Sequence, residues 1–295
     1  MATAHMPDEF YEVVAHHLPP ERPVGPAGGR PRVGHRPVLR VLWFALATGC
    51  RWEDVPPELG CSGRTAHRRL VAWEAAGIWD RVHADLLRLL RAAGKLDLSL
   101  AVVDGVYVRA FGGGGATGPS PVDRGKPGTK RTLLVSRSGV PLAVRTAGAN
   151  ASDHTQLPPA VLSFPRVGGK PGRPRQLPDE VYADRGYDSE AARHRLAWLG
   201  VAPRIADRAE PHGSGLGRVR WVVERTVSWL KGLRRMRVRY DRLRAVREAF
   251  TTLAAAVICF RTLHHDTLWL GRFCQCLLGS LPAYCRGPQT MMRSG

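Results

Sequence analysis

Apolar residues at helical spacing dominate the chain from residue 38 to residue 94. A nearly all-apolar run is followed by Gly49, which is typical of a helix end. Ser62 can cap a further helix, Gly77 can supply its left-handed stop, and Asp80 can cap the next one. Pro56-Pro57 opens a short turn or helix between them. We therefore expect helices over 38–48, 62–76 and 80–94.

From residue 98 onward the pattern changes to short apolar runs that are typical of strands. Segments 98–111 and 129–147 predict three strands, with Ser138-Gly139 as a hairpin turn and a flexible glycine-rich loop over 112–128. The later expected elements are a helix over 154–162, a strand over 181–183, a helix over 189–199, a strand over 201–205 and a long helix from about 218. This order predicts an α/β fold, a ribonuclease-H-like mixed sheet with flanking helices, preceded by a small all-helical, helix-turn-helix-like region.

The charge of the chain indicates an acidic polymer as its partner. Lysine and arginine number 44 against 25 aspartates and glutamates, which gives a formal net charge of +19. This excess is larger than solubility requires, and it suits the phosphates of a nucleic acid. Nearly all the basic residues are arginine, which a GC-rich coding sequence would also produce, so the inference rests on the charge.

Cysteine usage and hydropathy favour a cytoplasmic protein. The six cysteines form no CxxC pair, and the N-terminus has no secretory signal pattern. The most apolar segment, 245–260, contains charged residues and is shorter than a membrane span. No membrane role is expected.

The predicted helix over 62–76 is basic in its first half. Leu70 and Trp73 fall at the spacing of a buried face, while polar and basic residues crowd the first turns. Such a helix can place side chains in the major groove of DNA. The residues expected to contact DNA here are Arg64, Thr65, Arg68 and Arg69. A helical bundle with solvated arginines has the same pattern, so this alternative stays open.

Two aspartates interrupt or end apolar strands. Asp104 lies within the apolar segment 101–108, where a carboxylate is unfavourable unless it is paired, hydrogen-bonded or bound to a metal. Asp184 directly follows the strand over 181–183. Because open α/β sheets build their sites at the carboxyl ends of strands, both are candidate catalytic residues. Each alone could also be a turn or strand-end residue.

A third carboxylate lies on the long helix. At 100° per residue, Arg220, Glu224 and Lys231 fall within about 40° of one another and form one polar stripe. The apolar positions that we expect to be buried are Val222, Val223, Trp229, Leu230 and Leu233. A solvated salt-bridge face would give the same stripe.

The motifs around these carboxylates resemble those of bacterial insertion-sequence transposases of the insertion sequence five family, within the larger DDE group. VVDGVYVRA carries Asp104, YADRGYDS carries Asp184, and RWVVERTVSWLKGLRRMRVRYDR carries Glu224, in the order of the family. VLWFALATGCRWEDVPPELG also resembles the helical region of the family. The resemblance covers about residues 38–263.

The long helix also resembles the family's arginine–glutamate–lysine signature. Three residues separate Arg220 from Glu224, and six separate Glu224 from Lys231. Gly217 stands where the signature has a tyrosine, and this departure removes no metal ligand. By resemblance, Arg220 and Lys231 hold DNA phosphates beside the catalytic metals.

The resemblance implies a DNA transposase whose catalytic and metal-binding residues are Asp104, Asp184 and Glu224. Two ions of Mg²⁺, or Mn²⁺, are expected as cofactors, because these ions prefer oxygen ligands. One site would nick the end of the element and then join the freed 3′-hydroxyl to target DNA. The expected partners are double-stranded DNA, as terminal inverted repeats and target, and further copies of the chain in a homodimer or higher assembly. The expected location is the cytoplasm, in association with the nucleoid.

Four parts of the chain are expected on these grounds. They are a flexible basic arm over 1–37, a helical DNA-binding region over 38–95, a ribonuclease-H-like catalytic domain over 96–264 and a tail of unknown role over 265–295.

Alternatives remain for both the function and the acids. An inactive remnant or DNA-binding regulator would have structural carboxylates, and a ribonuclease-H-like nuclease would cut DNA without joining it. Asp153, Asp188 and Glu190 are reserve candidates only. Capping of the helix from residue 154 explains the first, and a helix's first turn favours the other two.

Overall fold

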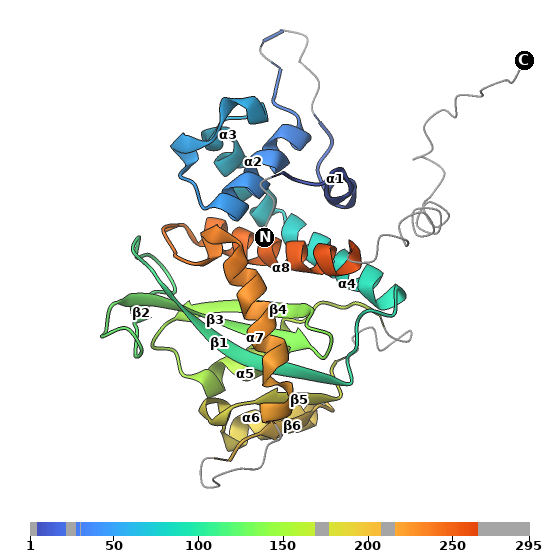
Figure 1. Cartoon of the computed structure of the whole chain (residues 1–295), viewed down its shortest axis with the longest axis vertical. Helices are drawn as coiled ribbons and strands as arrows, with labels where there is room; N and C mark the ends of the chain where they lie inside the picture. Colours follow the sequence, from blue (N-terminus) through green and yellow to red (C-terminus); the bar gives the residue numbers. More distant parts are fainter. Residues whose placement is uncertain (1–4, 22–27, 30, 169–176, 208–215, 265–295) are drawn as a thin grey trace, which may run out of the picture.

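A six-stranded mixed sheet forms the centre of the computed structural model, which describes residues 5–21, 28–29, 31–168, 177–207 and 216–264 (Figure 1). The strands are β1 (Leu100–Arg109), β2 (Gly118–Pro119), β3 (Pro127–Ser136), β4 (Pro141–Gly148), β5 (Glu180–Ala183) and β6 (Ala202–Ile205). The α-helices are α1 (Asp8–Ala15), α2 (His35–Thr48), α3 (Gly63–Ala75), α4 (Ile78–Ala92), α5 (Asp153–Leu162), α6 (Glu190–Trp198), α7 (Leu216–Gly232) and α8 (Arg244–His264). Short 3₁₀ helices are η1 (Trp52–Asp54), η2 (Pro57–Leu59), η3 (Arg185–Tyr187) and η4 (Arg234–Met236).

The sheet combines antiparallel and parallel strands, as the sequence predicts for a mixed sheet. β3 lies between β4 and β1 and is antiparallel to both, while β1, β5 and β6 run parallel. β2 adds a short antiparallel pairing at the start of β3. Three antiparallel strands followed by two parallel ones form a ribonuclease-H-like mixed sheet, which confirms the predicted fold class.

The hairpin and the helix ends follow the expected local chemistry. Gly139 has a φ of 87° in the turn between β3 and β4. Ser62 caps α3 by accepting a hydrogen bond from the Thr65 amide, and Gly77 ends it with a φ of 64°. The start predicted for α4 is wrong, because Gly77 is also its N-cap and Asp80 already lies in its first turn.

The predicted basic arm over 1–37 is wrong for residues 8–15, which form α1. Phe10 and Val14 are buried, and the Phe10 ring packs edge-on against Trp43 and Phe260. Burial of these two apolar side chains therefore holds α1 against α2 and α8. Residues 22–27 and 30 of the arm lie outside the described residues.

One apolar core runs through the helical region and the sheet domain. α8 packs against α3 and α4 on one side and against β4 on the other (Figure 1). The sequence boundary near residue 95 is therefore not a break in packing. None of the helices in the described residues is long and apolar enough to cross a membrane.

The glycine loop, residues 112–116, is held in place rather than free, which corrects the prediction of a flexible segment. Arg239 donates hydrogen bonds to the carbonyl oxygens of Gly113 and Gly115, each at 2.8 Å. A Cβ at Gly112 would lie 2.3 Å from the Tyr240 carbonyl oxygen. A glycine is needed there because the loop lies directly on the backbone that follows η4, a contact between segments far apart in the sequence.

Candidate active site

Asp104 and Asp184 lie at the carboxyl ends of a parallel strand pairing. Val102 in β1 is opposite Tyr182 in β5, so each aspartate lies two residues beyond this pair. Paired strands are about 4.8 Å apart. The strand register therefore brings together the two aspartates that the sequence singled out.

Backbone amides orient both carboxylates. The Gly105 amide donates to Asp104 Oδ1 at 2.7 Å, and the Gly186 amide donates to Asp184 Oδ1 at 2.9 Å. Asp184 is the N-cap of η3, which begins directly after β5. Each bond occupies one oxygen of its carboxylate and orients that carboxylate relative to the backbone.

α7 brings Glu224 to the same side of the sheet. The helix crosses β1, β3 and β5, and its buried Thr226 hydroxyl donates to the Gly139 carbonyl at 2.8 Å (Figure 1). Glu224 lies on the outward side, where Arg220 Nε donates to its Oε1 at 3.0 Å. Because the Glu224 side chain is 59% exposed, it can change rotamer without disturbing the core.

The pKa of Asp104 reports the proximity of the three carboxylates. Burial raises this pKa above its ordinary value, and the negative charges of Asp184 and Glu224 raise it further. The hydrogen bond from Gly105 and the charge of Arg220 act in the opposite direction. The site therefore carries excess negative charge that a bound cation would relieve.

The chemistry of these side chains fits a hard divalent cation, since all the donors are carboxylate oxygens. In the part of the chain that the structure describes, no three His, Cys, Asp or Glu side chains are close enough to hold a metal ion. Glu224 is turned toward Arg220.

A fourth acid, Asp153, lies beside the aspartates, and the capping explanation for it is wrong. Ser152 is the N-cap of α5, and Asp153 Oδ1 instead accepts a hydrogen bond from the buried Lys130 ammonium at 2.8 Å. A Cβ at Gly186 would lie 3.0 Å from Asp153 and 3.1 Å from Asp184. Lys130 therefore holds Asp153 in place next to the aspartates. The sequence offered two signals for this pair: Asp153 follows a predicted strand, and Lys130 lies within one.

Lys130→Met should lower the free energy of unfolding by about 3 kcal/mol. It removes the cation from a largely buried pair, and such losses amount to about 3–5 kcal/mol. Asp153 is 26% exposed and can regain water, which places the effect at the low end. Urea unfolding at pH 7 measures it. Arg204→Met, which breaks the more exposed pair with Glu180, serves as control and should leave stability nearly unchanged. Equal effects of the two substitutions would contradict the role of Lys130.

The other reserve acids pair with basic side chains of α6. Asp188 pairs with Arg193 at 2.8 Å, and the highly exposed Glu190 lies 3.7 Å from His194.

One position on α7 was predicted wrongly. Trp229 is 39% exposed, because it stands at the edge of the buried arc and is covered by the Arg225 guanidinium rather than by the sheet.

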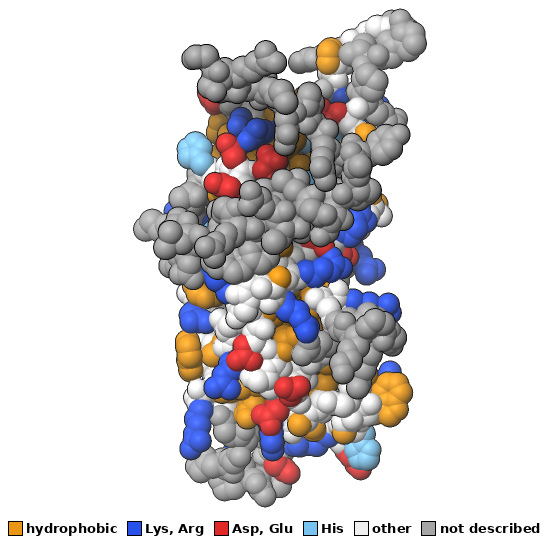
Figure 2. Space-filling model, turned by 90° about the vertical axis from the view of Figure 1, so that its right-hand side faces the viewer, with side chains coloured by type: hydrophobic (Ala, Val, Ile, Leu, Met, Phe, Trp, Pro, Cys, Tyr) orange, Lys and Arg blue, Asp and Glu red, His pale blue; other side chains and the backbone are white. Residues whose placement is uncertain are grey.

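The predicted DNA contacts differ in their exposure. On α3, Arg64 and Arg68 are exposed, whereas Arg69 donates to the Val33 carbonyl and Thr65 takes part in the Ser62 cap. Arg220 and Lys231 are exposed on α7. Figure 2 shows basic side chains spread over the described part of one face.

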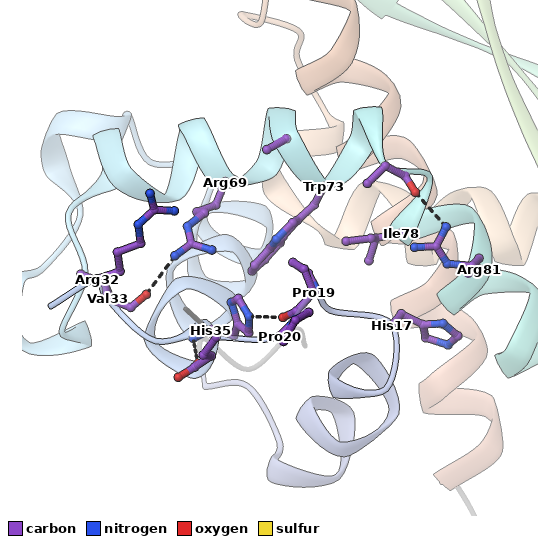
Figure 3. A pocket seen from close by; sticks show the side chains of 13 residues that line it. His17, Pro19, Pro20, Arg32, Val33, His35, Arg69, Trp73, Ile78 and Arg81 are labelled. Atoms are coloured by element: carbon purple, nitrogen blue, oxygen red, sulfur yellow. Dashed lines mark hydrogen bonds between the residues drawn. The ribbon is translucent and has the colours of Figure 1, made fainter. Parts of the chain in front are cut away.

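A cavity of about 420 Å³ lies between α3 and the N-terminal segment (Figure 3). Two of its basic side chains already hold the backbone: Arg81 donates to the Ala76 carbonyl at 2.8 Å, and His35 Nε2 bonds the Pro19 carbonyl at 2.8 Å. None of its lining residues comes from the sheet domain. We assign the cavity to the docking of the N-terminal segment on α3.

Known proteins resemble this chain over both of its regions. Residues 6–83 match the family described as putative transposase of IS4/5 family, and residues 95–259, more than half of the chain, match the transposase DDE domain. A putative transposase for insertion sequence element IS402 of Burkholderia cepacia is 48% identical over 147 residues, which cover 50% of this chain and 70% of the relative. A second protein of the same element, an uncharacterized 16.2 kDa protein, is 45% identical over 123 residues, covering 41% of this chain and 84% of the relative.

Solved structures give more distant likenesses. The Mos1 strand transfer complex is 12% identical with a TM-score of 0.35 and covers 85% of this chain and 79% of its own. The catalytic core domain of BIV integrase is 14% identical with a TM-score of 0.29, and the match covers 54% of this chain and 81% of the integrase domain. The fold assignment rests on the strand order of the sheet, and the family rests on the sequence matches. The chain belongs to the DDE transposases of the IS4/5 group and is a DNA transposase.

Proposed function

We propose that Asp104, Asp184 and Glu224 are the catalytic residues of this transposase and hold two divalent cations, Mg²⁺ or Mn²⁺. The observation that carries the proposal is the strand register that brings Asp104 and Asp184 side by side beyond the Val102–Tyr182 pair, with α7 packed against the same two strands. Three carboxylates from β1, from the end of β5 and from α7 thus act on one place. When bound, the cations would supply Lewis acids for the attacking and leaving oxygens of an in-line phosphoryl transfer.

The protein residues orient this reaction. Asp104 and Asp184 keep their carboxylates in place through the amides of Gly105 and Gly186. Glu224, which pairs with Arg220 at 3.0 Å in the structure, would hold the cations with the two aspartates, and the Arg220 guanidinium would then be available for a DNA phosphate. Lys231 lies further along the same exposed stripe and holds a second phosphate.

Double-stranded DNA is the proposed substrate, both as the terminal inverted repeats of the element and as the target. Arg64 and Arg68 are exposed in the first turns of α3, where they can enter the major groove. Thr65 and Arg69 position the start of this helix and contact DNA less directly. We expect two or more copies of the chain to assemble on the DNA ends, in the cytoplasm at the nucleoid.

The purified protein should cut DNA that carries the inverted repeats flanking its own gene, with Mg²⁺ or Mn²⁺, and should be inert in EDTA. Joined products with a plasmid target, resolved on a gel, measure strand transfer. Nicks without joined products would favour a nuclease. Specific binding without any cleavage in either metal would favour a DNA-binding remnant and contradict the proposal.

A further inference from the structure

Two exposed aromatic side chains stack beyond the end of β1. Phe111 and Tyr240 follow Ala110 and Arg239, which form an isolated parallel bridge. Their ring centroids are 5.7 Å apart and nearly parallel, at 13°, although the side chains are 60% and 66% exposed. In Figure 1 the segments that carry them, the end of β1 and the connection from η4 to α8, lie side by side at the left. We call these two residues the aromatic pair.

A buried arginine, Arg239, links the two backbone segments that carry the aromatic pair. Arg239 is only 2% exposed, and besides its bonds to the glycine loop it donates to the hydroxyls of Thr117 and Thr129 at 2.8 and 2.5 Å. A buried guanidinium is tolerated because its N–H groups are hydrogen-bonded. Arg247, also buried, donates to the Gly115 carbonyl at 2.5 Å. These bonds hold the segments that carry the aromatic pair in place, while more than half of each aromatic residue remains exposed to solvent.

The surroundings of the aromatic pair are basic. The Arg109 guanidinium lies 4.8 Å from the centroid of the Phe111 ring and also pairs with the Asp123 carboxylate at 3.7 Å. The carboxylate of Asp241 is occupied by Arg235 at 2.8 Å. Exposed arginines of the connecting segment and its borders are Arg234, Arg237, Arg242 and Arg244. Rigid aromatic faces among arginines match the mixed chemistry of nucleic acid, which offers base faces and phosphates together.

We propose that the aromatic pair is a second DNA contact of this transposase, in which the rings stack on bases of a distorted duplex while the neighbouring arginines hold its phosphates. The proposal rests on the proposed function, since it assumes DNA at the three carboxylates. Seven residues lead from Asp104 to Phe111, which is about 23 Å at strand geometry. Duplex DNA rises about 3.4 Å per base pair, so the contact falls within about seven base pairs of the cleaved phosphate.

Charge favours DNA over a second copy of the chain as the occupant of this surface. Each copy carries a formal net charge of +19, and bringing two arginine-rich surfaces together would place like charges opposite each other. A DNA duplex instead releases counterions when arginines neutralise its phosphates. Apolar side chains inserted between base steps are also a known means of bending DNA.

The test uses the full chain in EDTA and a duplex that carries one end of its element. Phe111→Ala and Tyr240→Ala should each weaken binding, measured by fluorescence anisotropy, by roughly 5- to 150-fold per stacked base lost. The slope of affinity against salt should stay unchanged, because no phosphate contact is removed. Permanganate should detect an unstacked thymine within about seven base pairs of the cleavage position with the wild type, and not with the Phe111/Tyr240 double variant.

Matched variants separate stacking from other effects. Trp198→Ala removes an aromatic side chain that is even more exposed, at 75%, and that likewise has an arginine, Arg195, over its ring. This variant should bind DNA as the wild type does. Tyr240→Phe keeps the stack and should restore binding, while Arg242→Ala should lower the salt slope. The proposal would be overturned if the double variant had the affinity and the permanganate pattern of the wild type. It would also be overturned if the double variant lost the ability to form dimers while its permanganate pattern stayed that of the wild type. Neither result affects cleavage by the wild type, so the proposed function is judged separately.

Discussion

Asp104→Asn should abolish DNA cleavage and, in the absence of metal, should make the folded protein more stable at neutral pH. Asparagine keeps the shape of the side chain and can still accept the hydrogen bond from Gly105, but it removes a half-buried negative charge next to Asp184 and Glu224. The same charge is what a divalent cation needs. A cleavage assay and urea unfolding in EDTA measure the two effects, which have opposite signs.

The pH dependence follows from the direction of the Asp104 pKa shift. Burial, then Asp184 and Glu224, raise the folded-state pKa above the ordinary value of 3.8. A carboxyl with a raised pKa binds its proton more tightly in the folded state, so its stabilising contribution is complete below 3.8 and is lost as the pH rises through the folded pKa. Asp104→Asn and wild type should therefore converge in stability at acid pH and separate as the pH rises.

The control for this prediction is Asp97→Asn. Hydrogen bonds from Ser99 lower the pKa of Asp97, so its loss should reduce stability at neutral pH rather than increase it. Mg²⁺ should stabilise the wild type and have little effect on Asp104→Asn. An Asp104→Asn protein that is less stable than wild type in EDTA at pH 7, or that cleaves DNA normally, would contradict the assignment.

Local patterns were sufficient to predict the elements that carry the site. The apolar run around Asp104, the short strand before Asp184 and the turn at Ser138-Gly139 each determine their own structure over a few residues, and the structure has a strand or hairpin at each place. The strand register then brings the two aspartates together. Their catalytic role stays a prediction, because it depends on a chemistry that strand order alone does not determine.

Contacts between distant segments account for what the sequence did not predict. Arg239 holds carbonyls of the glycine loop more than 120 residues earlier, so a run of glycines that suggested flexibility marks a close approach of two backbones. The pairing of Asp153 with Lys130 likewise depends on the packing of α5 against β3. α1 has few residues and begins without a side-chain cap, and its burial against Trp43 and Phe260 supplies the missing stabilisation.

Glu224→Gln should leave the protein folded and able to bind its DNA ends while cleavage falls by more than about 100-fold. Loss of an exposed ion pair with Arg220 changes stability by about 1 kcal/mol or less. Removing an outer partner of a metal ligand already reduces affinity or activity by about 10- to 100-fold, so removing a ligand itself should exceed that. Thermal unfolding, DNA binding in EDTA and cleavage with Mg²⁺ are measured on the same preparation.

Glu190→Gln is the matched control for Glu224→Gln, because Glu190 is also an exposed helical glutamate with a basic partner one turn later, His194 at 3.7 Å. It should cut DNA at the wild-type rate. Arg220 gives a further distinction: if Glu224 serves only to pair with it, Arg220→Gln and Glu224→Gln should both leave cleavage intact. If Glu224 holds a cation, its loss should raise the Mg²⁺ concentration needed for any residual cleavage, whereas the loss of Arg220 should weaken DNA binding instead. A folded Glu224→Gln protein that cuts at the normal rate and normal Mg²⁺ concentration would remove α7 from the active site.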